Sequence, residues 1–100
     1  MTPTNLTPEE RTFLLTLARQ TIEQAARSAS RDVEPDLSPP TDRLTEPGAT
    51  FVTLHTLDGA LRGCIGSLVA RRPLVEDIHA NALAAAFSDP RFPPVAPSEL

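Results

Sequence analysis

The strongest constraint on the fold is the dipeptide Asp58-Gly59, which lies between two runs rich in β-branched and apolar residues, 49–57 and 61–68. Asp-Gly is favoured at the centre of a two-residue type I′ turn, because both central positions of that turn need a positive φ angle. Val, Thr and Phe in the flanking runs favour extended backbone. The sequence therefore predicts an antiparallel β-hairpin that reverses direction at Asp58-Gly59.

A reversal at this point also predicts the register of the two strands, whose side chains alternate between two faces. The predicted cross-strand pairs are Thr53 with Cys64, His55 with Arg62, Val52 with Ile65, and Leu54 with Gly63. The face expected to be buried consists of Val52, Leu54, Leu61 and Ile65. The opposite face consists of Phe51, Thr53, His55, Arg62, Cys64 and Gly66.

A first helix is predicted from about Pro8 to about Ser28. Thr7 has the position of an N-cap, Pro8 suits the first helical position, and Glu10 is placed to close a capping box. Apolar and small residues then recur at helical spacing, which indicates one packed face. That face consists of Leu14, Leu17, Ala18, Thr21 and Ala25, with Phe13 and Ile22 beside it.

A second helix is predicted from Pro73 to about Ser88. Glu76 and Asp77 complement the positive end of its dipole. Its apolar face consists of Leu74, Ile78, Ala82 and Ala85. His79 lies beside this face, where a surface position or a satisfied helix position is expected.

The segment 30–48 contains four prolines, has an acidic excess and shows no periodicity. It is predicted to be a long, exposed connection; loops of this length are functional or mobile, and a mobile loop is the expectation here. The segment 91–100 shows no element that would close the fold. Asp89-Pro90-Arg91-Phe92-Pro93 fits either a proline-rich surface or a stiff turn that leads into a further strand.

These elements indicate an α+β fold, in which an antiparallel hairpin is flanked by two main helices. A chain of 100 residues forms at most one domain. A two-stranded hairpin is only marginally stable without further strands or a large helix face. We therefore expect residues 1–100 to be the N-terminal part of a larger domain, or to receive strands from a partner chain.

Charge and cysteine content exclude several classes of protein. The net charge is -4, and no basic stripe is visible, which argues against a nucleic-acid partner. A single cysteine cannot form an intramolecular disulfide, and no membrane-length apolar run is present. A cytoplasmic protein without membrane contact is the expectation, and the sequence does not indicate an oligomeric state.

Four separated motifs resemble the AMMECR domain family, and in particular the bacterial branch called AmmeMemoRadiSam system protein A. The motifs are Leu6-Thr7-Pro8-Glu9-Glu10, Pro47-Gly48-Ala49-Thr50-Phe51-Val52-Thr53-Leu54, Leu61-Arg62-Gly63-Cys64-Ile65-Gly66 and Asp89-Pro90-Arg91-Phe92-Pro93-Pro94-Val95. The resemblance implies an antiparallel sheet flanked by helices, and genetic association with a Memo-type protein and a radical S-adenosylmethionine protein. It also implies further strands after the position of Leu100. It implies no known reaction, although RNA modification and an accessory role have been suspected for the family.

Cys64 is the candidate nucleophile, because a thiolate is stabilised by neighbouring positive charge such as Arg62 and protonated His55. The alternative for Cys64 is a small half-buried hydrophobe under a helix. Glycines inside a strand mark a bulge or a close approach of another backbone or a ligand. The candidate binding residues are therefore Arg62, Gly63, Gly66 and Ser67.

Three functional hypotheses follow from these residues. The first is an accessory or binding protein that acts beside the Memo-type and radical enzymes and uses the edge from Arg62 to Gly66. The second is a cysteine-dependent enzyme, such as a transferase or an RNA-modifying activity, with Cys64 as nucleophile. The third is a structural module without a site in this half. One Cys and two His lack zinc-ligand spacing, so no metal is predicted, and no cofactor is identified.

Overall fold

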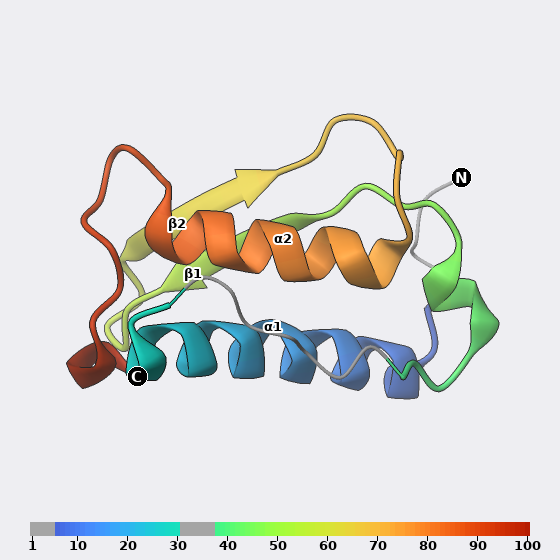
Figure 1. Ribbon diagram of the computed structural model, residues 1–100, viewed down its shortest axis with the longest axis horizontal. Coiled ribbons are helices and arrows are strands. Elements are labelled where there is room, and N and C mark those ends of the chain that lie inside the picture. Colours follow the sequence, from blue (N-terminus) through green and yellow to red (C-terminus); the bar gives the residue numbers. More distant parts are fainter. Residues whose placement is uncertain (1–5, 31–37) are drawn as a thin grey trace.

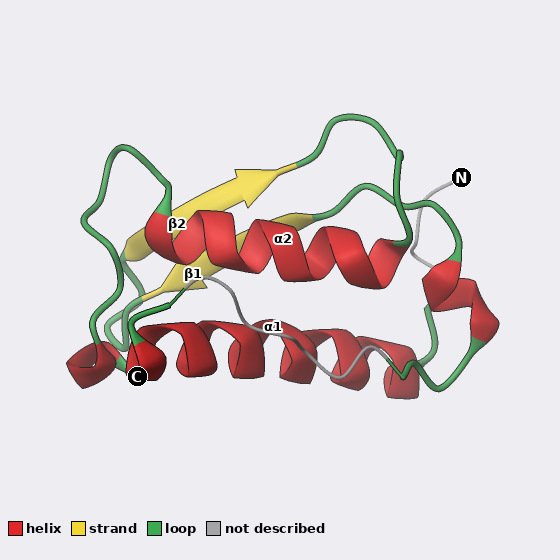
Figure 2. Cartoon of the chain, viewed as in Figure 1, coloured by secondary structure: helices red, strands yellow, loops and turns green. Residues whose placement is uncertain are grey.

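The computed structural model describes residues 6–30 and 38–100, which form an α+β fold. Its elements are α1 (Pro8–Ser28), η2 (Asp42–Thr45), β1 (Phe51–His55), β2 (Leu61–Gly66), α2 (Leu74–Phe87) and η3 (Pro97–Glu99). The two strands form an antiparallel hairpin, and α2 packs against one of its faces (Figures 1 and 2). The other long helix, α1, packs against α2 and lies beyond the β1 edge of the hairpin (Figure 1). The predicted fold class is confirmed.

The start of α1 has the predicted capping box. The Thr7 hydroxyl accepts the N–H of Glu10 at 3.1 Å, and the Glu10 carboxylate accepts the N–H of Thr7 at 2.8 Å. Glu10 also accepts the hydroxyl of Thr41, which precedes η2. These hydrogen bonds join the first turn of α1 to the connection that follows it. Local sequence therefore determines where α1 begins, as predicted.

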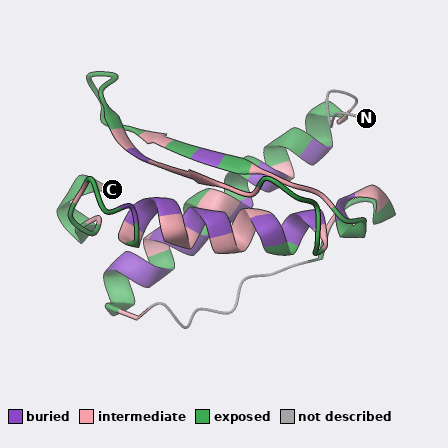
Figure 3. Cartoon of the chain, turned by 90° about the horizontal axis from the view of Figure 1, so that it is seen from above, coloured by how far each residue is buried: buried purple, intermediate pink, exposed green. Residues whose placement is uncertain are grey.

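Two apolar clusters hold the layers together. The first contains Leu14, Leu17, Leu44, Leu74 and Val75, and the second contains Ile22, Val52, Ala82, Ala85 and Ala86. Figure 3 shows buried residues along both α1 and α2. Between the helices, Thr21 Oγ1 and His79 Nδ1 are 3.1 Å apart, so His79 is a satisfied helix position as expected. Burial lowers the pKa of His79 below its usual value.

The turn of the hairpin differs from the prediction. Thr56 N–H donates to the carbonyl of Ala60 at 2.9 Å, and Gly59 N–H donates to the carbonyl of Thr56 at 2.9 Å. The loop therefore has three residues, Leu57 to Gly59. Gly59 has a φ of 91°, whereas Asp58 does not have the positive φ that a type I′ turn requires. A type I turn followed by a left-handed glycine replaces the predicted turn.

A bulge at Arg62 compensates for the longer loop. Leu54 pairs with Gly63, but the next residue, His55, pairs with Leu61, so Arg62 is the extra residue of β2. The predicted pairs Thr53 with Cys64, Val52 with Ile65 and Leu54 with Gly63 are confirmed. The predicted pairing of His55 with Arg62 is wrong. Leu61 consequently shares the face of His55 and is 40% exposed rather than buried.

In the described part of the connection before β1, residues 38–48, most residues are exposed and one is buried; residues 31–37 of the predicted segment lie outside the described residues. Leu44 in η2 is fully buried in the first cluster. Gly48 N–H donates to the carbonyl of Arg72, and Leu74 N–H donates to the carbonyl of Glu46. This end of the connection is therefore tied to the start of α2.

The C-terminal segment also closes part of the fold, which the sequence did not indicate. Phe92 N–H donates to the carbonyl of Asp89, and η3 follows instead of a strand. Val95 and Leu100 pack against the second cluster. The absence of helical or strand periodicity hid these long-range contacts. Among the described residues, no helix is both long and apolar enough to cross a membrane.

We predict that Gly63→Ala destabilises the protein far more than Gly66→Ala. A Cβ at residue 63 would lie 2.1 Å from the carbonyl oxygen of Ala85, which is helix backbone and cannot move alone. At residue 66 the Cβ would meet the ring of Phe51, which is 63% exposed and can rotate away. Urea unfolding should give a loss of about 2–3 kcal/mol for Gly63→Ala. Equal losses for the two variants would contradict this packing argument.

Candidate functional site

The side of the hairpin that faces away from α2 carries three of the six predicted site residues, His55, Cys64 and Gly66. We call it the outer face and define it as Phe51, Thr53, His55, Leu61, Cys64 and Gly66. Phe51, the first residue of β1, is 63% exposed, and Leu61, the first residue of β2, is 40% exposed. The outer face therefore presents apolar surface beside a half-buried thiol.

Cys64 lies opposite Thr53, and its Sγ is 3.3 Å from Thr53 Oγ1. Its backbone N–H donates to Asp89 Oδ2 at 3.0 Å, so the β2 edge is capped at this residue. Among the described residues, no hydrogen bond links His55 to the sulfur. The structure thus gives Cys64 a hydroxyl neighbour and no imidazole partner. Its role as a nucleophile stays a prediction.

Arg62 does not share the outer face, which corrects the prediction that placed it beside His55 and Cys64. The bulge turns its side chain towards the C-terminal segment, where Nε and Nη2 donate to the Glu99 carboxylate at 2.7 and 3.1 Å. The guanidinium also lies 5.9 Å from the ring centroid of Phe92. Hydrogen bonding to Arg62 lowers the pKa of Glu99. The ion pair of Arg62 with Glu99 therefore holds η3 against the hairpin.

Both glycines of the Leu61–Gly66 segment have a packing explanation within the chain. Gly63 allows the backbone of α2 to approach, as its close distance to Ala85 shows. Gly66 lies under the ring of Phe51 from the opposite strand. The close approach inferred from sequence is thus a contact with protein at both positions. Their predicted roles in ligand binding stay predictions.

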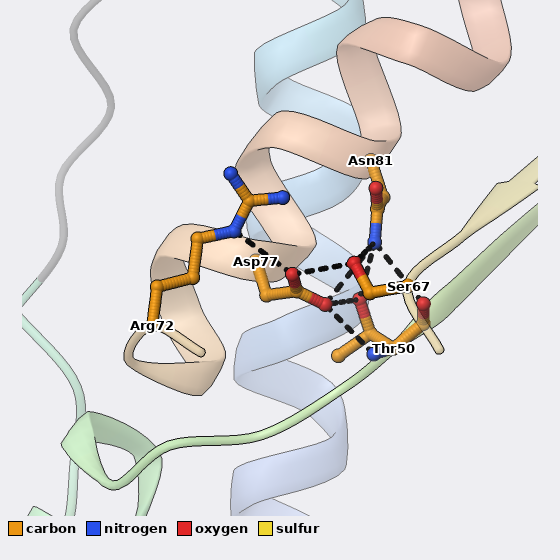
Figure 4. A network of polar contacts seen from close by, with 5 residues as sticks. All are labelled: Thr50, Ser67, Arg72, Asp77 and Asn81. Carbon is orange, nitrogen blue, oxygen red and sulfur yellow. Dashed lines mark hydrogen bonds and ion pairs between the residues drawn. The ribbon is translucent and has the colours of Figure 1, made fainter. Parts of the chain in front are cut away.

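Ser67 belongs to a buried polar network centred on Asp77 (Figure 4). The Asp77 carboxylate accepts the N–H and the hydroxyl of Thr50, both at 2.7 Å, and the hydroxyl of Ser67 at 2.7 Å. Arg72 Nε donates to it at 2.9 Å and Asn81 Nδ2 at 3.1 Å. With so many donors the 2% exposed carboxylate is fully satisfied, which indicates a structural role.

The pKa of Asp77 reflects two opposing effects. Burial raises it, but the hydrogen bonds from Thr50, Ser67 and Arg72 together outweigh burial and lower the pKa below its usual value. From the sequence, Asp77 was expected only to complement the helix dipole. The network could not be predicted because its donors come from three separate segments of the chain.

Asp89 is a second buried carboxylate that the sequence did not identify as important. Arg91 donates to it through Nε at 3.0 Å and Nη2 at 2.7 Å, and its own backbone N–H also donates at 3.0 Å. These hydrogen bonds from Arg91, with that of Cys64, hold the pKa of Asp89 far below its usual range. Asp89 therefore links β2 to the turn after α2. In the part of the chain that the structure describes, no group of three or more His, Cys, Asp or Glu is placed to hold a metal ion.

The fold and this site define a small α+β protein whose hairpin carries a cysteine between two closely packed glycines. The AMMECR1 family profile matches residues 15–100, and the chain belongs to this family. It is 52% identical over 69 residues to a protein of Thermotoga maritima, covering 68% of this chain and 40% of that protein. It is 46% identical over 97 residues to Protein MK0488 of Methanopyrus kandleri, covering 95% of this chain and 45% of that protein.

A solved structure supports the same assignment. The crystal structure of the uncharacterized protein PH0010 from Pyrococcus horikoshii matches 91% of this chain with a TM-score of 0.75 and 39% identity. The match covers 45% of the Pyrococcus chain. This chain therefore spans about half the length of the relatives that it matches.

We predict that Asp77 contributes stability that depends on pH. Its folded pKa lies below the usual aspartate value of 3.8, so the contribution is present above that pH and is lost as the pH falls through the folded pKa. Asp77→Asn should lower the free energy of unfolding by roughly 3 kcal/mol at neutral pH, because buried donors lose their charged acceptor. The difference from wild type should shrink in acid unfolding scans below pH 3.8. A difference that is constant with pH would contradict this role.

Proposed function

We propose that this protein is a binding component, and not itself the catalyst, of a system that includes a Memo-type protein and a radical S-adenosylmethionine protein. Membership of the AMMECR1 family is shown, and the motif resemblance favours the AmmeMemoRadiSam system protein A branch. In this proposal, the outer face of the hairpin is the surface that the partner protein contacts.

The proposal rests on one combined observation. The outer face exposes apolar side chains, and neither of the candidate residues His55 and Arg62 is hydrogen-bonded to the Cys64 thiol among the described residues. Phe51 and Leu61 are exposed on the outer face, whereas Arg62 is held by Glu99 on the other side. Protein interfaces are enriched in aromatic and apolar side chains that become buried on association. A docking surface needs such side chains and does not need an acid or base beside the thiol.

The first test is co-purification of the tagged protein with the Memo-type and radical S-adenosylmethionine proteins of the same genome. Leu61→Asp should reduce the recovered partner by about tenfold or more, because an unpaired carboxylate would be buried at the interface. Gln20→Asp is the matched control, since it adds the same charge at an exposed position of α1. The proposal is wrong if no complex forms, or if Leu61→Asp binds as well as the control.

The cysteine-dependent enzyme is the alternative function. It is favoured only by the accessible position of Cys64 beside Thr53. Neither His55 nor Arg62 makes a hydrogen bond with the sulfur among the described residues. The alternative therefore needs a base from outside this part of the chain.

For this reason we predict that iodoacetamide alkylates native Cys64 no faster than a small free thiol at about pH 6.5, since the cation near Cys64, Arg91, is already paired with the Asp89 carboxylate. Mass spectrometry of the labelled protein over time gives the rate. Cys64→Ser should leave the partner complex unchanged. Labelling that is faster than the free thiol would instead support the enzyme and weaken the docking proposal.

A further inference from the structure

The dipeptide Asp58-Gly59 at the tip of the hairpin carries backbone chemistry that the proposed function does not use. It is the only place in the 100-residue sequence where aspartate or asparagine precedes glycine. In such a pair the glycine nitrogen can attack the carboxyl carbon of the aspartate side chain, because glycine has no side chain to hinder the approach. The ring that forms, a succinimide, opens with water to aspartate or to isoaspartate.

The loop is open to solvent on every side. Thr56, Leu57, Asp58, Gly59 and Ala60 are all exposed. A Cβ built on Gly59 would meet no atom within 4 Å apart from its chain neighbours. Crowding therefore does not protect the pair, and its protection in the folded chain depends on hydrogen bonds.

Thr56 engages both groups that take part in ring closure. Its backbone carbonyl accepts the N–H of Gly59 at 2.9 Å, so the attacking nitrogen is already hydrogen-bonded. Its hydroxyl donates to Asp58 Oδ1, and the N–H of Ala60 donates to the same oxygen at 3.4 Å. The hydrogen bond from Thr56 lowers the pKa of Asp58, which keeps the carboxyl ionised. An ionised carboxylate resists attack, because its oxygen leaves as water only after protonation.

We propose that Asp58 is a site of isoaspartate formation that the hydroxyl of Thr56 holds in check in the folded protein. When the loop opens, the Gly59 nitrogen bonds to the side-chain carboxyl carbon of Asp58. The bond from that carbon to its hydroxyl breaks, and the proton from the nitrogen leaves with the hydroxyl as water. Water then adds to one of the two ring carbonyls and breaks the carbon–nitrogen bond there. Opening at the original main-chain carbonyl gives isoaspartate, so the reaction consumes and returns only water.

The product changes the hairpin at a defined place. Isoaspartate adds one carbon to the main chain of the three-residue loop. The N–H of Thr56 and the carbonyl of Ala60, which are 2.9 Å apart across the loop, then lose their matched spacing. The bulge at Arg62 compensates for the present loop length, so a longer loop disturbs the pairing there as well. Conversion at Asp58 is thus expected to alter the hairpin from its tip and to leave the helices intact.

The test incubates the folded protein and its variants at neutral pH and measures isoaspartate at residue 58 by peptide mass spectrometry with electron-transfer fragmentation. Thr56→Val keeps the shape of the side chain and removes the hydroxyl, so isoaspartate should form about fivefold faster or more. Thr56→Ser keeps the hydroxyl and should react at the wild-type rate. Thr45→Val, at an exposed threonine outside the hairpin, is the matched control and should also react as wild type does. Far-UV circular dichroism establishes that each variant is folded.

Two further samples define the limits of the rate. Wild type unfolded in guanidinium chloride should form isoaspartate about tenfold faster or more than the folded protein, because the loop is then permanently open. Asp58→Glu, whose ring would need six members, should give no product and so assigns the signal to residue 58.

Each possible contrary result overturns a stated part of the proposal. Equal rates for wild type and Thr56→Val, or a Thr56→Ser rate as high as that of Thr56→Val, would show that the hydroxyl gives no protection. Equal rates in folded and unfolded wild type, or no isoaspartate in either, would remove the site itself. All of these measurements use the chain without a partner. This proposal and the proposed function therefore fail separately.

Discussion

The carboxylate of Asp77 is the interaction on which the arrangement of the sheet and α2 depends. It accepts hydrogen bonds from Thr50, which precedes β1, and from Ser67, which follows β2. Both strand ends are thereby attached to the first turns of one helix. Arg72 compensates the charge from the loop that enters α2. Removing water from a carboxylate is unfavourable, so this position is stable only because every donor is in place.

The close packing of the hairpin on α2 follows from the same attachment. Once both strand ends are fixed, the strands lie so close to α2 that only glycine fits at residue 63. Alanines on α2 complete the contact, since Ala82, Ala85 and Ala86 are all buried there. Much of the Leu61–Gly66 segment therefore packs against other parts of the chain. What remains exposed is one face of the hairpin and one edge of β1.

In the hairpin, the predicted register of the core pairs is correct, although the predicted turn is wrong. The Asp58-Gly59 pattern predicted a two-residue turn, and the actual loop is one residue longer. The bulge at Arg62 adds one residue to β2, so the core pairs return to the predicted alignment. Packing of buried Val52 and partly buried Ile65 against α2 favours that alignment, because a one-residue slip of either strand would turn its own apolar side chain away from the helix. Only Leu61 and the bulge residue Arg62 lie on the opposite face from the one predicted.

By itself, the sequence determined the features that depend on neighbouring residues. These are the capping box at Thr7, the bounds of the two helices, the hairpin and the α+β class, and the motifs that place the chain in the AMMECR1 family. Tertiary structure alone decided the direction of Arg62, the burial of Leu44, and the partners of Asp77 and Asp89. Hydrogen bonds between residues far apart in the chain leave no periodic signal. Their partners become definable only when packing brings the segments together.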